Sequence, residues 1–358
     1  QSTDWFRSAQ ATVEQEDFFH WELEYPSVFF NEDGEKRSDA GFDIVIGNPP
    51  YVFIDSIPEE HRDYFRKTSD TWDYRYDLYG LFIEKGVSIT KTAGAFGYII
   101  PHNLLNNNSF RDLRDFLLNC NSEISVVDFT APVFQDASNE PMLLLTRPST
   151  TEQTQYIEST LIDPGELLFD TWEFTEYSTS SLERLPEKPF IVRGGSWIED
   201  ILTSESTRQL GEFVDAVQGL RTGNNTERLA QNQETPNHRK ALAGDDIFRY
   251  GHEWSGTWTL YDRDLLSSDT AARPREPKYW EADIKILVQE IRNVHLSQRI
   301  VASIDEDEYI GLNTTNAIIT KDNTDISIYY LMAIISSKLM NVFFKCCFID
   351  NHIATQYL

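Results

Sequence analysis

The stretch FDIVIGNPPYV, at residues 42–52, constrains the fold of this chain more than any other part of its 358 residues. Residues 42–46 form a nearly continuous apolar run, which is typical of a central strand buried on both faces of a parallel sheet. Pro49 and Pro50 cannot donate hydrogen bonds to a sheet and have a fixed φ, so the strand must end before them. In open α/β sheets, ligands bind just beyond the carboxyl ends of the strands. The stretch therefore predicts a buried parallel strand that leads into a stiff loop at a binding edge.

The loop itself offers two hydrogen-bond acceptors beside an aromatic ring. Asn48 supplies a side-chain amide oxygen, Pro49 supplies a carbonyl with no N–H of its own beside it, and Tyr51 supplies a flat face. A Pro-Pro pair by itself is more often an ordinary rigid turn. The complete string, in contrast, suits a planar base that carries an exocyclic amino group.

Helix and strand patterns alternate downstream of this loop. A helix over 78–89 with an apolar face on the sheet is predicted by residues at roughly helical spacing, namely Leu78, Leu81, Phe82, Lys85 and Ile89. Further patterns predict a turn at 93–97, a strand at 96–100 closed by Pro101, a helix over 110–118 with Arg111 and Arg114 on its polar side, and a hairpin of strands at 124–129 and 141–146. The alternation predicts an α/β fold built on a parallel sheet.

These motifs resemble a known family, the amino-methyltransferases that modify adenine in DNA, whose fourth motif is Asn-Pro-Pro-Tyr or Asn-Pro-Pro-Phe. The lead-in FFHWELEYPSVFFNEDGEKRSDAG is similar to the segment that precedes the catalytic strand in large restriction-modification methylases of the Eco57I-like or type IIG kind. YDLYGLFIEKG (76–86), AGAFGYIIPHNLL (93–105) and VFQDASNEPMLLLTR (133–147) are similar to the later motifs of that family, in the same order. The resemblance covers most of the first 150 residues.

The resemblance implies an N6-adenine-specific DNA methyltransferase with Asn48, Pro49, Pro50 and Tyr51 as its catalytic loop. Asn48 Oδ1 and the Pro49 carbonyl would accept the two amino hydrogens of adenine and so localise the nitrogen lone pair as it attacks the methyl group. Because that amino group is paired in the duplex, the base must first be flipped out. Tyr51 would stack on it, and the family's second aromatic corresponds to Phe134, which is otherwise a core residue.

Two further expectations follow from the resemblance. Asp77 corresponds to an acidic position near the active-site pocket, although it also suits a helix N-cap. The cofactor would be S-adenosyl-L-methionine, but no glycine-rich donor-binding loop precedes residue 48. We therefore expect this chain to be the later part of a longer protein, or to receive the donor-binding part from a partner subunit, and we expect little activity from it alone.

The sequence beyond residue 150 has its own organisation. We expect residues 1–150 to form the partial methyltransferase domain, the C-terminal part of a Rossmann-like sheet. A connecting segment would cover 151–195, and a mixed α+β target-recognition domain would cover 196–358. The segments ALAGDDIFRYGHEW, KILVQEIRNVHLSQRIVASIDEDEYIGLNTTNAIITKD and YYLMAIISSKLMNVFF resemble the target-recognition domains of the same enzymes, in order.

Polar and cationic side chains in this second part are candidates for contact with double-stranded DNA. The string Gly-Leu-Arg-Thr-Gly-Asn-Asn at 219–225 predicts a flexible loop that carries a cation, which suits a phosphate or a base edge and is equally compatible with a plain surface turn. The candidate DNA-binding residues are Arg221, Thr222, Asn224, Asn225, Arg249, Arg292 and Asn313.

The charge of the chain conflicts at first sight with DNA binding. There are 58 acidic and 31 basic residues, a formal net charge of −27, and only 11 of the 31 are lysines. A DNA-binding protein is expected to have a basic face, so a protein that does not bind nucleic acid is one reading. An excess of carboxylates with few lysines also suits a protein of a halophilic archaeon, in which molar salt screens self-repulsion. The motifs argue against a protein that does not bind nucleic acid, so we interpret the acidic composition as a sign of halophilic origin.

The remaining features are less informative. The three cysteines and seven histidines show no metal-ligand spacing, so no metal site and a reducing cytoplasm are predicted, and no signal peptide or membrane span is visible. Asp283, Lys285 and Glu290 are expected at the surface, and the acidic run SIDEDEYIG is expected to be solvated. Two other functions remain open, namely methylation of protein glutamine or RNA, which uses the same loop chemistry, and a non-catalytic DNA-specificity module.

Overall fold

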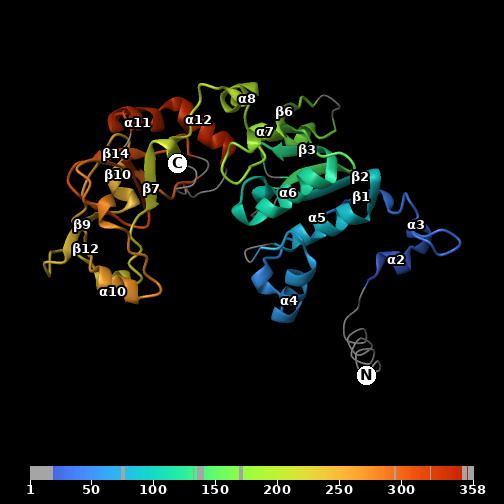
Figure 1. Cartoon of the computed structure of the whole chain (residues 1–358), viewed down its shortest axis with the longest axis horizontal. Helices are drawn as coiled ribbons and strands as arrows, with labels where there is room; N and C mark the ends of the chain where they lie inside the picture. Colours follow the sequence, from blue (N-terminus) through green and yellow to red (C-terminus); the bar gives the residue numbers. More distant parts are fainter. Residues whose placement is uncertain are drawn as a thin grey trace. The chain divides into compact units, whose positions relative to one another are not determined.

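A computed structural model describes residues 19–73, 77–131, 133–134, 141–168, 172–293, 296–322, 324–348 and 353 (Figure 1). The chain divides into two compact units. Unit 1 comprises residues 1–104 and 112–174, and unit 2 comprises residues 105–111 and 175–358. The boundary thus lies later than the predicted end of the first domain at residue 150, because a further strand of the first unit follows that position.

Unit 1 is an α/β unit. Its elements are α2 (Trp21–Glu24), α3 (Pro26–Phe29), β1 (Phe42–Gly47), α4 (Glu59–Thr68), α5 (Leu78–Ile89), β2 (Thr90–Pro101), α6 (Arg111–Cys120), β3 (Asn121–Phe129), β4 (Pro141–Pro148) and β5 (Tyr156–Ile162). The strands are ordered β1-β2-β4-β3-β5, and only β4 is antiparallel to its neighbours. The predicted α/β class and the β3–β4 pair are confirmed, and the carboxyl ends of β1, β2, β3 and β5 meet at one edge of the sheet.

Aromatic residues of the lead-in fix the start of β1. The rings of Trp21, Tyr25 and Phe29 each meet the ring of Phe42 edge-on, with centroids 5.6, 5.5 and 5.7 Å from it. Edge-to-face contacts at such distances are favourable beyond the apolar area that they bury. The lead-in motif therefore packs around the first residue of the strand that carries the candidate catalytic loop.

The prediction that β1 is buried on both faces is wrong for this structure. Ile44 is 65% exposed and Ile46 is 78% exposed. Within the described residues, β1 pairs with β2 alone, in parallel, so it is an edge strand. An apolar run shows that a strand is suited to burial, but it does not show what covers the strand.

Two helices are confirmed, but details of their faces are corrected. The buried residues of α5 include Tyr79, Ile83 and Val87, whereas Phe82 of the predicted face is 44% exposed. In α6, Arg114 is fully buried and donates from Nη1 to the carbonyl of Leu104 at 2.9 Å, so it does not belong to a polar face. An arginine side chain can be buried when its apolar stem packs in the core and its guanidinium group has a hydrogen-bond acceptor. The charge of the residue alone does not predict this burial.

The expected turn at residues 93–97 lies inside a strand. β2 runs through it, but its register against β1 shifts between Phe42 and Ile44, and Ala93 has a positive φ of 60°. The segment is thus a local irregularity of β2 rather than a separate turn. The expected connecting segment at 151–195 likewise contains regular structure, namely β5, β6 (Thr175–Ser178) and α7 (Thr179–Leu182).

Unit 2 is a mixed α+β unit with two four-stranded sheets. Its further elements are α8 (Ser196–Thr203), β7 (Val214–Gln218), α9 (Asn225–Arg228), β8 (Leu229–Ala230), β9 (His238–Leu242), β10 (Ile247–Phe248), β11 (Gly251–His252), β12 (Trp258–Leu260), α10 (Arg263–Ser268), β13 (Lys285–Gln289), β14 (Ala302–Asp305), β15 (Ile310–Gly311), β16 (Thr315–Thr320), α11 (Ile328–Ile335) and α12 (Lys338–Cys347). One sheet has the order β14-β13-β16-β7 and the other β15-β9-β12-β8. β10 and β11 form a separate hairpin.

The core of unit 2 contains an ion pair that the sequence does not reveal. Lys285 Nζ lies 2.7 Å from Asp305 Oδ2 on the neighbouring strand, and both side chains are fully buried. Glu290 is also buried, with 6% of its surface exposed. The prediction that Lys285 and Glu290 lie at the surface is therefore wrong. The acidic run is solvated at Glu306, whereas Asp305 belongs to the core.

Among the described helices, none on its own has the length and apolar composition to cross a bilayer, whereas α11 and α12, bent by 58°, meet that test as a pair.

Candidate functional site

The loop at residues 48–51 leaves the carboxyl end of β1, as the sequence predicts. Gly47, the last residue of β1, lies against the ring of Tyr98 in β2, and a Cβ at this glycine would come within 3.1 Å of that ring. In the loop, Asn48 is exposed and Pro49 is buried. The buried proline anchors the loop and leaves the amide of Asn48 accessible at the sheet edge.

Tyr51 is held in place by neighbouring elements. Its hydroxyl donates a hydrogen bond to the carbonyl of Ile99 in β2 at 3.0 Å. Its ring meets that of Tyr79 in α5 edge-on, with centroids 6.2 Å apart and planes at 81°. The side chain is partly buried, and burial raises the pKa of the phenol, which is therefore neutral near pH 7. The orientation of the ring is thus set in the absence of any ligand.

Asp77 occupies the N-cap position of α5, but its side chain makes no capping hydrogen bond. Phe53 and Asp77 form a backbone bridge, and the N–H of Leu78 donates to the carbonyl of Val52 at 2.8 Å. These contacts place Asp77 beside the end of the loop. Burial raises the pKa of its carboxyl. The N-cap interpretation thus describes the backbone position, and the carboxyl has no side-chain partner among the described residues.

Phe134 follows β3 and is 42% exposed, so it is not the core residue that its alternative interpretation requires. β1 and β3 both run in the same direction as β2, so their carboxyl ends lie at the same edge of the sheet. Phe134 follows β3 at this edge, and Asn48 and Tyr51 follow β1 there. The next residues of this motif, 135–140, lie outside the described residues.

Glycines in unit 1 do not form a cradle for a nucleoside cofactor in the described residues. Gly94 and Gly97 of the AGAFG string lie inside β2. A Cβ on Gly94 would come within 2.9 Å of the carbonyl oxygens of Asp43 and Lys91, so this glycine permits the close packing of strands. The residues present therefore do not by themselves fit S-adenosylmethionine.

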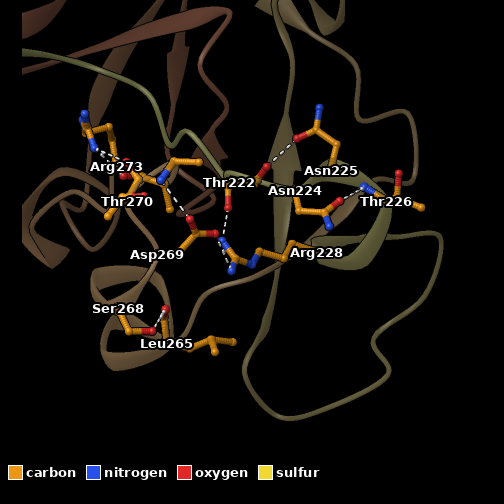
Figure 2. A network of polar contacts seen from close by, with 12 residues as sticks. Thr222, Asn224, Asn225, Thr226, Arg228, Leu265, Ser268, Asp269, Thr270 and Arg273 are labelled. Atoms are coloured by element: carbon orange, nitrogen blue, oxygen red, sulfur yellow. Dashed lines mark hydrogen bonds and ion pairs between the residues drawn. The ribbon is translucent and has the colours of Figure 1, made fainter.

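In unit 2, the loop at residues 219–228 follows β7 and is shaped by its own side chains (Figure 2). Thr222 donates from its hydroxyl to Asn225 Oδ1, and Asn224 Oδ1 accepts from the backbone N–H of Thr226 at 3.1 Å. Three of the predicted DNA-binding residues, Thr222, Asn224 and Asn225, are thus engaged in hydrogen bonds within the loop.

Arg228 and Asp269 connect this loop to the segment after α10. Arg228 Nη2 lies 2.8 Å from Asp269 Oδ2, and Nη1 donates to the carbonyl of Thr222. The backbone N–H of Ala271, and then Arg228, hold the pKa of the Asp269 carboxyl below its usual range. Gly223 has a φ of +82°, and a Cβ there would come within 2.6 Å of Asp269 Oδ2, so the loop geometry requires glycine.

Arg221 lies at the outer side of this network. It is exposed, and its backbone forms an antiparallel bridge with Arg273, whose N–H donates to the Arg221 carbonyl at 2.8 Å. Leu220, immediately before it, forms a parallel bridge with Leu312. The structure thereby brings together Arg221 and Asn313, two of the predicted DNA-binding residues, because each follows one member of that bridge.

Two known families match separate parts of the chain. The family described as Eco57I restriction-modification methylase matches residues 2–134, and the TaqI-like C-terminal specificity domain matches residues 239–358. Residues 2–134 are thus similar to a restriction-modification methylase domain, and residues 239–358 are similar to a specificity domain. The 219–228 loop lies between the two matched ranges.

Three curated relatives support this assignment. A type II methyltransferase of Thermus thermophilus is 35% identical over 83 residues, which are 21% of this chain and 19% of the relative. The type II restriction enzyme and methyltransferase RM.Eco57I of Escherichia coli is 27% identical over 37% of this chain and 15% of its own length. A putative type II restriction enzyme and methyltransferase of Methanocaldococcus jannaschii is 23% identical over 90% of this chain and 26% of its own length. The chain therefore spans about a quarter or less of these relatives.

Solved structures with a related arrangement include two bound to DNA. The type IIL restriction-modification enzyme MmeI in complex with DNA has a TM-score of 0.48 at 11% identity, and the match covers 83% of this chain and 43% of that one. The ATP-dependent type ISP restriction-modification enzyme LlaBIII bound to DNA also has a TM-score of 0.48 at 11% identity, with 88% of this chain and 28% of that one covered.

The other predicted DNA-binding residues of the specificity domain lie apart from Arg221. Arg249 is exposed at the tip of the β10–β11 hairpin and donates to the carbonyl of Ser336 at 3.1 Å. Arg292 is partly buried, donates to the carbonyl of Gln298 at 3.0 Å and to the Gln289 side chain, and has a pKa lowered by burial. Among the described residues, no backbone bridge joins either arginine to Arg221.

One group of metal-ligand types occurs in the specificity domain. Ligand atoms of His252, Asp305 and Asp307 lie within 4.8 Å of one another. Asp305, however, is already paired with Lys285, and its two oxygens accept backbone N–H groups of Asp307 and Tyr309. Asp305 is therefore a core residue whose oxygens already have partners, whereas His252 is partly buried and Asp307 is exposed.

The sequence analysis missed two cations near the 219–228 loop. Arg273 and Arg275 belong to the string RPREPK, and Arg275 donates from Nε to the carbonyl of Gln218 at 2.8 Å. The density of basic residues in this string, within a chain that is otherwise strongly acidic, is the signal that would have found them.

Proposed function

We propose that this chain is the catalytic-loop and specificity part of an enzyme that methylates adenine N6 in duplex DNA, within a restriction-modification or phage-defence system. The observation that carries the proposal is the 48–51 loop at the carboxyl end of β1, with an accessible Asn48 and a pre-oriented Tyr51. The methylase and specificity domains of the chain support it.

The proposed chemistry places the loop around the amino group of adenine. The amino nitrogen is a weak nucleophile because its lone pair is delocalised into the ring. Asn48 Oδ1 and the Pro49 carbonyl would accept its two hydrogens, and these bonds strengthen as the nitrogen becomes positive in the transition state. Pro50 fixes the backbone of the loop, so the acceptors need little reorganisation. After the transfer, the positively charged nitrogen would return to neutrality by releasing one of its two protons to water.

Access to the amino group requires the adenine to leave the helix. Unstacking and unpairing cost a few kcal/mol. Tyr51 would offset about 1–3 kcal/mol of that cost by stacking, by analogy with single-strand platforms. Phe134, exposed at the same edge of the sheet, would contact the flipped base from a second side.

The methyl donor in this proposal is S-adenosylmethionine, which supplies an activated sulfonium methyl group. Its binding site would be completed by other parts of the full protein or by a partner subunit, since the described residues do not form a cradle and the chain spans about a quarter or less of its curated relatives. We further propose a cytoplasmic enzyme of a halophilic organism, on the ground of the acidic composition.

The test is mass spectrometry of nucleosides from the DNA of cells that express the full-length gene, in wild-type form and as Asn48→Ala. Asn119→Ala, which changes an exposed asparagine on α6, is the matched control. We expect 6-methyladenine with the wild type and with Asn119→Ala and its loss with Asn48→Ala. If the wild-type protein is folded in a salt-rich host and leaves the DNA unmodified, the proposal is wrong, and protein glutamine and RNA become the substrates to test.

A further inference from the structure

Two exposed arginines face each other across a backbone bridge in unit 2. Arg221 and Arg273 are opposite residues of an antiparallel pair, so their side chains leave the same face of the ribbon. Their neighbours Leu220 and Ala272 are buried with 0% and 2% exposure, in the core beside Trp280. The ribbon therefore has one face in the core and the other, which carries the two guanidinium groups, in solvent.

The charges of this pair are not compensated by the protein. Neither Arg221 nor Arg273 forms an ion pair with a carboxylate in the part of the chain that the structure describes, and the guanidinium of Arg273 donates there to the carbonyls of Thr270 and Ala272. Like charges placed directly opposite each other destabilise a strand pair. In a chain with 58 acidic residues, some exposed arginines have carboxylate partners, as in Arg37–Asp39, Arg147–Glu123 and Arg208–Glu212. Like the facing pair, the exposed Arg239, Arg249 and Arg263 form no such ion pair among the described residues, but none of these three lies opposite a second arginine in a backbone bridge.

The surroundings of the pair maintain this excess of positive charge. Asp269, which belongs to the 219–228 network, is held by Arg228 at 2.8 Å and faces the loop (Figure 2). Arg275 lies two residues beyond Arg273 and is a third cation, tied to the carbonyl of Gln218. Glu290 accepts from the Gln218 side chain at 2.7 and 2.8 Å, and its negative charge acts on Arg275.

We propose that Arg221 and Arg273 bind the phosphodiester backbone of DNA, as a pair of cations that position the specificity unit along one strand. The inference rests on the proposed function and assigns a contact to named residues. Opposite residues of an antiparallel pair have Cα atoms about 4.5–5.5 Å apart, so both guanidinium groups can reach one phosphate or two successive phosphates. The planar donor fork of arginine matches phosphate oxygens, and Asn313, next to Arg221 in register, adds an exposed amide.

The experiment measures the salt dependence of DNA binding by the full-length protein. Fluorescence anisotropy with a labelled duplex gives the association constant over a series of potassium chloride concentrations, for the wild type, Arg221→Gln, Arg273→Gln and the double variant. Arg208→Gln removes the same charge from an exposed arginine that is paired with Glu212, and it is the control for net charge. Thermal unfolding of each variant confirms that it is folded.

Each phosphate contact contributes about 0.9 to the slope of log K against log salt. We therefore expect the slope to become shallower by about one in each single variant and by about two in the double variant, with an equal loss of affinity on duplexes of unrelated sequence. Arg208→Gln should keep the wild-type slope. Slopes equal to that control, or losses that depend on the DNA sequence, overturn the inference. If the wild type methylates DNA but the arginine variants keep the wild-type salt slope, this inference alone is refuted. If the variants show the expected slopes but the wild type does not methylate DNA, the proposed function alone is refuted.

Discussion

Replacement of Tyr51 separates the two roles that the structure gives to this side chain. Tyr51→Phe keeps the ring and removes the hydrogen bond of 3.0 Å to the carbonyl of Ile99, while Tyr51→Ala removes both the bond and the ring. Since burial raises the pKa of the phenol, the hydroxyl is neutral near pH 7 and neither variant changes a charge. Any effect therefore reports on position and stacking rather than on electrostatics.

The magnitudes follow from the two interactions. A neutral hydrogen bond within a protein contributes about 0.5–1.5 kcal/mol, so Tyr51→Phe should lower kcat/KM about 2- to 13-fold. Stacking of a base on an aromatic ring contributes about 1–3 kcal/mol, so Tyr51→Ala should lower kcat/KM by a further factor of about 5 to 160. The edge-on contact with Tyr79 is kept in Tyr51→Phe and lost in Tyr51→Ala.

The assay is single-turnover transfer of a labelled methyl group onto a duplex that carries the modified site, with the full-length protein. A second duplex places a mismatch opposite the target adenine, which lowers the cost of flipping. If Tyr51 stabilises the flipped base, the defect of Tyr51→Ala should shrink on the mismatched duplex. Equal losses in Tyr51→Phe and Tyr51→Ala, or a Tyr51→Ala enzyme within twofold of the wild type, would refute the stacking role.

Three further predictions concern stability. Because the pKa of the Asp77 carboxyl is raised in the folded protein, the folded state binds this proton more tightly than the unfolded state does. Folding stability should therefore fall as the pH rises from the unfolded pKa of 3.8 through the folded pKa. In Asp77→Asn, denaturation midpoints measured against pH should no longer show this fall. Lys285→Met leaves Asp305 unpaired in the core and should cost about 3–5 kcal/mol in chemical denaturation, and a cost below 1 kcal/mol would contradict the pairing. Gly223→Ala should cost about 1–2 kcal/mol because of its positive φ, and an unchanged unfolding midpoint would argue against that conformation.

The sequence predicts local features of this fold well because their causes are local. Two consecutive prolines end a strand whatever surrounds it, and the start of α5 at Leu78 and the strand at 124–129 follow from apolar periodicity. The position of the candidate loop at the carboxyl end of β1 could be predicted from the same local pattern. The roles of Asn48 and Tyr51 remain predictions, since they come from a resemblance rather than from geometry.

Other features depend on tertiary contacts that no pattern contains. The exposure of Ile44 results from the position of β1 at the sheet edge, and the burial of Arg114 results from a carbonyl of Leu104 that lies ten residues earlier. The facing arginines 221 and 273 are 52 positions apart and meet only through a backbone bridge. Sequence reasoning can list such residues, but it cannot pair them.

The buried pair Lys285–Asp305 also constrains the sheet that leads to Arg221. It joins β13 to β14, and β13 pairs with β16 and β16 with β7, the strand that precedes Arg221. A slip by one residue would turn Lys285 to the opposite face and separate it from Asp305, which penalises that error. An ion pair buried in the core thus opposes register errors in the sheet from which the chain continues to the arginine pair.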